Sequence, residues 1–214
     1  MPTTTIPALK KIADKPADAA ARGLEFSAQA SALRAKGESA SAWLAKIEAA
    51  ALHEDAIKLL AAALPVRECV HWALVCSREA IAKTNEPEQS AALDAAARWT
   101  TDPSDANRRA AGAASEKAEL DNSAGCTALA AFMSGGSLAP AGLTSVPPAA
   151  HLCALSAGCA IQLAALMEGP LQAAKHLRRF FELGLKLAAE PAPWEAPPPP
   201  PPATVKATAK SQSG

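Results

Sequence analysis

The chain has 214 residues, equal numbers of acidic and basic side chains, and about a quarter of its residues are alanine. A formal net charge of zero argues against RNA or DNA as a partner, because nucleic-acid-binding domains usually carry an excess of basic residues. Aromatic residues make up only 4% of the chain and tyrosine is absent, whereas alanine is the best helix former. We therefore expect an all-α protein that is long enough to bury one substantial core.

Composition divides the chain into three segments. Residues 1–23 are expected to be weakly structured, because three prolines interrupt any long helix there. Residues 24–190 are expected to form one compact domain of about eight helices. After Pro191 the apolar periodicity stops, and Trp194 is followed by six consecutive prolines. Residues 191–214 are therefore predicted to be a disordered proline-rich tail, which could be a spacer or a docking peptide for a proline-binding partner.

Capping residues mark where the first helices begin. Ser27 is expected to cap a helix that runs to about Ala35, and Ser39 a second helix that carries Trp43. A third helix should run from about Glu54 to Leu64.

A central helix is predicted to begin after Pro65, since proline is favoured in a first helical turn. Trp72 lies at the border of its apolar side, and its large side chain should be buried. The residues that share the apolar side at helical spacing are Val66, Cys69, Val70, Ala73, Leu74, Cys76, Ala80 and Ile81.

The next helix boundaries rest on turn and capping signals. Asn85 is expected to cap the helix that contains Trp99. In the stretch from Asp102 to Asp105, Asp102 is expected to cap a further helix, with Pro103 at its first position. A helix from about Ser123 to Met133 should end in the turn Ser134-Gly135-Gly136-Ser137.

Two long helices are expected to complete the domain. Ala149 to Met167 is almost wholly apolar and nearly long enough to cross a membrane, but alanine and glycine favour insertion only weakly. We therefore predict a buried core helix and no membrane span. The last helix, about Leu171 to Ala189, is amphipathic, with its lysine and arginine side chains facing solvent.

Cysteine usage and the N-terminus indicate the compartment. The five cysteines are an odd number and all lie in apolar helical patterns, which is typical of buried, reduced thiols. Residues 1–11 contain no apolar run of the kind that a signal peptide requires. We expect a cytoplasmic protein.

Several short motifs occur in a characteristic order. They are Glu54-Asp55-Ala56-Ile57, Arg67-Glu68, Trp72, Ala97-Arg98-Trp99-Thr100, Asp102-Pro103, Asn107-Arg108-Arg109-Ala110-Ala111, Ser134-Gly135-Gly136-Ser137-Leu138-Ala139-Pro140, and Phe180-Phe181 with Leu183-Gly184-Leu185. Over about residues 24–189 the chain resembles a family of uncharacterised bacterial helical proteins, a domain of unknown function. The resemblance implies an all-helical fold, a bacterial origin and a setting of type VI secretion, but no activity. The family pattern usually has an aromatic residue at position 71, where this chain has histidine, so no shared role follows for His71.

One group of titratable residues lies on the polar side of the central helix: Arg67, Glu68, His71 and Arg78. Glu68 and His71 are three residues apart and can pair. The group is our candidate partner-binding site, since arginines pair well with carboxylates. The competing interpretation is a solvated helix face, or buried pairing with neighbouring helices.

The remaining motifs point to no catalytic, metal or cofactor site. The chain lacks both Cys-x-x-Cys and His-Glu-x-x-His spacing, which argues against a metal site. The turn from Ser134 to Ser137 lacks the Gly-Lys-Ser/Thr ending of a phosphate loop, and no nucleophile elbow is present.

The function that these observations favour is a non-catalytic helical interaction or adaptor protein with an unidentified protein partner, associated with secretion. The alternative is a chaperone-like protein that binds an effector or a small molecule in a groove between helices. The third class is an enzyme whose site is not recognisable from its motifs.

Overall fold

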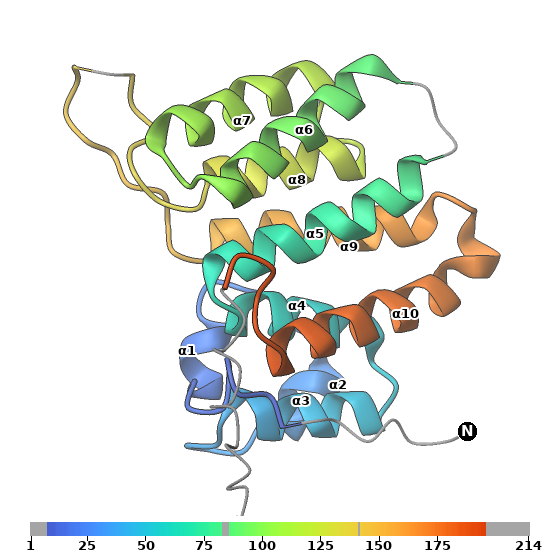
Figure 1. Cartoon of the computed structure of the whole chain (residues 1–214). Coiled ribbons are helices and arrows are strands. Elements are labelled where there is room, and N and C mark those ends of the chain that lie inside the picture. The colour runs from blue at the N-terminus through green and yellow to red at the C-terminus, as the bar shows by residue number, and fades with distance from the viewer. Residues whose placement is uncertain (1–7, 83–85, 141, 196–214) are drawn as a thin grey trace, which may run out of the picture.

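The computed structural model describes residues 8–82, 86–140 and 142–195, and within these ranges it is all-α, as the composition predicts. These residues form ten helices and no strand, against the about eight helices expected, and the short α1 and α2 belong to the ten. Figure 1 shows α6, α7 and α8 on one side of α5 and α9, with α4, α10 and the first three helices on the other. The helices are α1 (Ala17–Ala21), α2 (Ala28–Leu33), α3 (Ala40–Ala49), α4 (His53–Ala63), α5 (Val66–Ile81), α6 (Pro87–Thr101), α7 (Asp105–Ala118), α8 (Ser123–Phe132), α9 (Leu152–Leu166) and α10 (Pro170–Ala189).

The apolar α9 shares the centre of the molecule with α5. Its buried residues take up a broad side against α4, α5, α8 and α10, while Leu155, Cys159 and Leu166 on the remaining side are exposed. A helix that is apolar on all sides is stable in water only when other elements cover most of its surface. No helix among the described residues is both long and apolar enough to span a membrane.

The central helix α5 buries most of the side that its spacing predicts, although Val66 at its first position is 43% exposed. Trp72 is buried, and its indole Nε1–H donates to the carbonyl oxygen of Phe180 in α10 at 2.8 Å. A methyl group added at Gly184 would lie 2.6 Å from the Trp72 ring. The indole therefore fits against α10 where that helix has no side chain.

The N-terminal segment packs more closely than the sequence predicts. Within the expected weak segment 1–23 the structure describes residues 8–23, in which Leu9 and Ile12 join the core. The Lys11 N–H donates to the carbonyl of Ala188 at the end of α10, at 3.1 Å. Short apolar runs without periodicity gave no signal for this packing.

Two of the predicted N-caps are confirmed and one is wrong. Ser27 and Ser39 each accept a backbone N–H three residues on, as expected for N-caps. The prediction for Asp102 is wrong: α6 runs up to Asp102, and Ser104 caps α7. The Asp102 carboxylate accepts instead from the Ser104 hydroxyl at 3.2 Å. The predicted cap at Asn85 lies outside the described residues.

The C-terminal strap, residues 190–195, continues the packed structure beyond α10. Ala192 in the strap is 2% exposed, and its N–H donates to the Glu195 carboxylate at 2.7 Å. In Figure 1 the strap, in red, turns back from the end of α10 across α5. The predicted tail 191–214 is thus described only to Glu195, and its six prolines lie outside the described residues.

Candidate functional site

Arg67 on α5 is held in place by the end of α6. Its Nε–H donates to the carbonyl of Thr100 and its second guanidinium nitrogen to the carbonyl of Thr101, both at 2.7 Å. The last carbonyls of a helix have no partner within the helix, so a cation is favoured there by hydrogen bonding and by the helix dipole. Two of the donors of Arg67 therefore serve the fold.

Glu68 points into the protein rather than to a partner. The residue is 6% exposed, and its carboxylate forms an ion pair at 3.4 Å with Lys11 of the N-terminal segment. A buried carboxylate needs such a counter-charge. The structure thus pairs Glu68 with Lys11, where the spacing predicts pairing with His71.

The half-buried side chain of Trp194 covers Arg67 and His71. The guanidinium carbon of Arg67 lies 4.4 Å from the centre of the Trp194 ring, within the range of a cation–π interaction. The His71 ring meets the same indole edge to face, with centroids 5.4 Å apart and planes at 88°. Sequence reasoning missed Trp194, because a tryptophan in a proline-rich segment has no periodicity to indicate its neighbours.

The pKa of His71 is lowered from its ordinary value of 6.5. Burial of the ring is the main cause, and the nearby positive charge of Arg78 adds to it, while Glu68 acts in the opposite direction. The imidazole is therefore neutral at pH 7, and it meets Trp194 as an uncharged aromatic ring.

Arg78 forms its ion pair with a neighbouring helix rather than with one of the other three predicted residues. It is exposed, and its guanidinium pairs at 3.1 Å with Asp94 of α6, which is also exposed. An ion pair in this setting contributes little to stability. The structure thus brings Arg67 and His71 together under Trp194, whereas Glu68 pairs with Lys11 and Arg78 pairs with Asp94.

A small apolar pocket opens beside His71, between α5, α10 and the strap. Its volume is about 190 Å³. Val75, 39% exposed, forms part of its wall, while Lys186 and Glu190 add charged groups to its lining. The lining residues are His71, Trp72, Val75, Leu183, Lys186, Leu187, Glu190, Pro191 and Pro193. We call this region, together with Arg67 and Trp194, the α5–α10 face.

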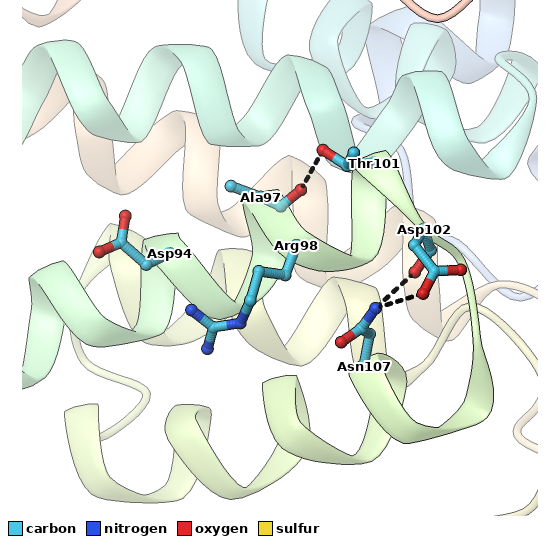
Figure 2. Close-up of a pocket in the computed structure, with 6 residues that line it drawn as sticks. All are labelled: Asp94, Ala97, Arg98, Thr101, Asp102 and Asn107. Atoms are coloured by element: carbon cyan, nitrogen blue, oxygen red, sulfur yellow. Dashed lines mark hydrogen bonds between the residues drawn. The ribbon is translucent and has the colours of Figure 1, made fainter.

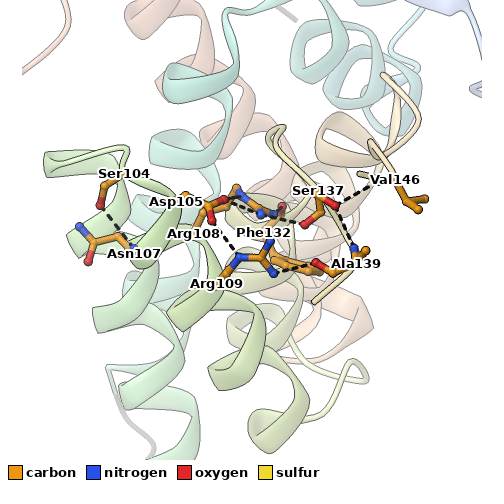
Figure 3. A network of polar contacts seen from close by, with 9 residues as sticks. All are labelled: Ser104, Asp105, Asn107, Arg108, Arg109, Phe132, Ser137, Ala139 and Val146. Carbon is orange, nitrogen blue, oxygen red and sulfur yellow. Dashed lines mark hydrogen bonds and ion pairs between the residues drawn. The ribbon is translucent and has the colours of Figure 1, made fainter. Parts of the chain in front are cut away.

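A second polar cluster surrounds Arg108, whose guanidinium is almost fully buried (Figure 3). It donates to the carbonyls of Phe132 and Ser137, both at 2.9 Å, and pairs with the Asp105 carboxylate at 2.7 Å. Arg109 binds the other oxygen of Asp105 and the carbonyl of Ala139. Two of the family-like motifs therefore meet here, and their polar groups fasten the turn after α8 to the start of α7.

An open groove between α6 and α7 has a volume of about 460 Å³ and contains Asp94, Arg98 and Asp102 (Figure 2). On one side the Asn107 amide donates to both the carbonyl and the carboxylate of Asp102, at 2.9 Å each. These bonds close the turn between the two helices. Asn107 and Asp102 therefore stabilise the connection, and Arg98 extends over the groove.

The cysteines are all free thiols, and four of the five are buried; Cys159 is exposed, contrary to prediction. Burial raises the pKa of Cys126 to about 11, and the pKa of Cys69 is raised by a hydrogen bond with Cys153 and by burial. These groups are therefore neutral thiols at pH 7 and weak nucleophiles. Within the described ranges no three His, Cys, Asp or Glu side chains group as ligands for a metal ion.

Comparison with known proteins identifies a family but no function. The model of a family of unknown function, DUF6931, matches residues 43–188, which is more than half of the chain. No curated protein and no solved structure matches the chain. The match supports the resemblance to an uncharacterised domain, and all the motifs that carry it, from Glu54 to Leu185, lie in the matched range.

Proposed function

The chain belongs to this family of unknown function, DUF6931, and we propose that it is a non-catalytic helical interaction protein that binds a protein partner through its α5–α10 face. The observation that carries the proposal is the open apolar pocket between α5, α10 and the strap. Protein interfaces gain most of their affinity from a few side chains that fill such pockets, and polar groups at the rim add specificity.

The size and lining of the pocket favour an apolar side chain as its occupant. A volume of about 190 Å³ is below the range of 300–1,000 Å³ that is typical of pockets for whole small molecules. Trp72, Val75 and Leu187 supply an apolar lining, and Lys186 and Glu190 supply one charge of each sign. A leucine or aromatic side chain of a partner would bury its surface here while neighbouring backbone groups reach these two charges.

The titratable groups near the pocket already have partners within the protein, which supports binding rather than catalysis. General acid–base chemistry needs a group that can reach a substrate and exchange a proton near neutral pH. Arg67 is bound to the end of α6, and Glu68 is buried against Lys11. His71, with its lowered pKa, faces the strap's indole.

The two other classes of function remain hypotheses with distinct predictions. A chaperone-like protein for an effector or a small molecule would use the larger groove between α6 and α7. An enzyme would need a substrate that brings Arg98 and Asp102 of that groove into use. For the leading proposal, a type VI secretion setting, a bacterial origin and a cytoplasmic location are the context in which we would search for the partner.

The test replaces Val75 by a photo-crosslinking amino acid in the full chain, with the same replacement at Leu120 as a matched control. Both positions are exposed and apolar, and Leu120 lies between α7 and α8, outside the pocket lining. We expect position 75 to crosslink one protein that position 120 does not. The captured protein is then purified and titrated against the variants V75K and L120K.

The proposal predicts that V75K weakens binding of the purified partner at least tenfold, with a melting temperature close to that of the native chain. L120K should bind as the native chain does. Equal affinity of V75K and the native chain would place the interface elsewhere, and would contradict the proposal.

A further inference from the structure

The strap lies on α5 in the way that a bound peptide lies on a receptor. Its Trp194 makes a cation–π contact with the Arg67 guanidinium and an edge-to-face contact with the His71 ring. Pro191 and Pro193 line the neighbouring pocket, and Ala192 between them is buried. The Ala192 N–H to Glu195 hydrogen bond closes the turn that presents the tryptophan.

We propose that the surface of Arg67 and His71 is a binding site for a proline-flanked tryptophan in an extended segment of a partner protein, and that the strap occupies this site as an internal ligand. The inference rests on the proposed function, because it names the kind of partner that the α5–α10 face accepts: the partner segment replaces the strap, and its own prolines take the places of Pro191 and Pro193 beside Val75. The partner segment would carry proline before the tryptophan and an acidic residue after it, as the strap does.

The fixed position of Arg67 explains why the site prefers tryptophan. A guanidinium attracts the face of an aromatic ring, and indole gives the strongest such interaction. Because the carbonyls of Thr100 and Thr101 hold Arg67, little side-chain freedom is lost when an indole binds. Neutral His71 adds a second aromatic contact and brings no further positive charge close to Arg67.

The prolines explain why an extended segment fits. Proline fixes the backbone near φ −65°, so that a proline-rich segment loses little entropy on binding. Grooves that recognise such segments are lined by aromatic side chains. Here Trp72 and His71 line the pocket against which Pro191 and Pro193 lie.

The few contacts of the strap make it displaceable. Only Ala192 among residues 191–195 is fully buried, and Trp194 is half-buried. A tethered ligand nonetheless competes strongly, since a short linker gives an effective concentration on the order of millimolar. A partner segment must therefore bind more tightly than the strap, or the strap must be released first.

The test is a titration of a fluorescently labelled peptide with the sequence of residues 189–195 against full-length W194A and the native chain. We expect W194A to bind the peptide at least tenfold more tightly than the native chain, because the internal tryptophan no longer competes. A second full-length variant, A192E/W194A, unseats the rest of the strap and should bind at least as tightly as W194A.

Altered peptides serve as controls and do not depend on the folding of a variant. The peptide in which alanine replaces tryptophan should not bind W194A, and leucine in its place should weaken binding about tenfold, since leucine keeps apolar area but loses the cation–π contact. Equal binding to W194A and the native chain, binding that does not need the tryptophan, or no binding to either W194A variant would overturn the inference.

A second copy of this chain is the other source of such a segment. If the native chain forms a dimer that W194A abolishes, the strap of the second copy is the occupant, and the assignment to a partner protein is wrong. Failure of the peptide titration is separate from failure of the proposed function, because the crosslink at position 75 reports on the pocket without requiring a tryptophan ligand.

Discussion

Single residues show that the polar groups of this protein serve mainly to join segments. Arg108 connects the first turn of α7 to the end of α8 and to the following turn, through carbonyl oxygens of Phe132 and Ser137. Arg67 similarly connects α5 to the end of α6. In both cases a guanidinium supplies donors to carbonyls at a helix end, which have no partner within the helix, and Arg108 also binds the Ser137 carbonyl in the following turn.

We expect R108K to lower the free energy of unfolding by about 3 kcal/mol, because lysine cannot reach Phe132, Ser137 and Asp105 together and leaves half-buried carbonyls without donors. Urea denaturation measures this change. R109K is the matched control: the Arg109 side chain is 32% exposed, so its replacement should cost less than about 1 kcal/mol. Equal stability of the two variants would show that the Arg108 bonds contribute little.

The sequence motifs contain Arg67 and Arg108, but they do not predict which carbonyls these residues bind. The motifs that contain Arg108 and Ser137 are 29 residues apart in the sequence but meet in space, as Figure 3 shows. Local patterns predict which residues cap a helix and which are buried, but not which distant carbonyl an arginine side chain reaches. Asp102 shows that local sequence also fails to fix a helix start. Aspartate and serine are both favoured N-cap residues, and it is the path of the chain between α6 and α7 that makes Ser104 the N-cap.

Helices pack closely in this molecule where one of them lacks a side chain. Gly184 of α10 lies against the Trp72 ring and the Leu60 side chain, and both neighbours are fully or almost fully buried. Glycine costs up to about 1 kcal/mol in a helix interior, so its presence here needs a packing reason. The sequence predicted that Trp72 is buried and that α10 is amphipathic, but it did not show that the indole occupies the space beside Gly184.

G184A should therefore lower the free energy of unfolding by about 1–2 kcal/mol, because the overlap of the new methyl group with Trp72 exceeds the gain in helix propensity. The matched control is G158A in α9, where an added methyl group meets no atom within 4 Å. G158A should be neutral or stabilise the protein by up to about 1 kcal/mol. Thermal unfolding of both variants gives the comparison, and a stabilised G184A would contradict the described packing of α5 on α10.

At the scale of the whole molecule, the strap brings residues 190–195 onto the side of α5 that carries the predicted titratable residues Arg67 and His71. Periodicity predicted that α5 has a polar side with Arg67 and His71, and this side is indeed where the strap lies. It did not predict that Trp194 covers them, since this tryptophan contacts residues more than a hundred positions earlier in the chain. The pocket beside His71 was equally hidden, because it requires α5, α10 and the strap together.

The lowered pKa of His71 makes the stability of the folded protein depend on pH. Between its ordinary value of 6.5 and the lower value in the folded protein, the unfolded chain binds more protons than the folded chain. Stability should therefore fall as the pH is lowered through this window. The charged groups Arg78 and Lys11 lower the pKa of His71 and Glu68 raises it, so H71Q removes this contribution and leaves the others in place.

The most direct test of the central claim, that the strap lies on α5 at Arg67 and His71, is fluorine NMR of the full chain labelled with 5-fluorotryptophan. The chain has four tryptophans, and the W194F variant assigns the resonance of Trp194. We predict that this resonance lies away from the position of a solvent-exposed tryptophan, shifts with pH with a midpoint below 6.5, and loses that shift in H71Q. A Trp194 resonance at the solvent-exposed position that does not respond to pH would contradict the claim.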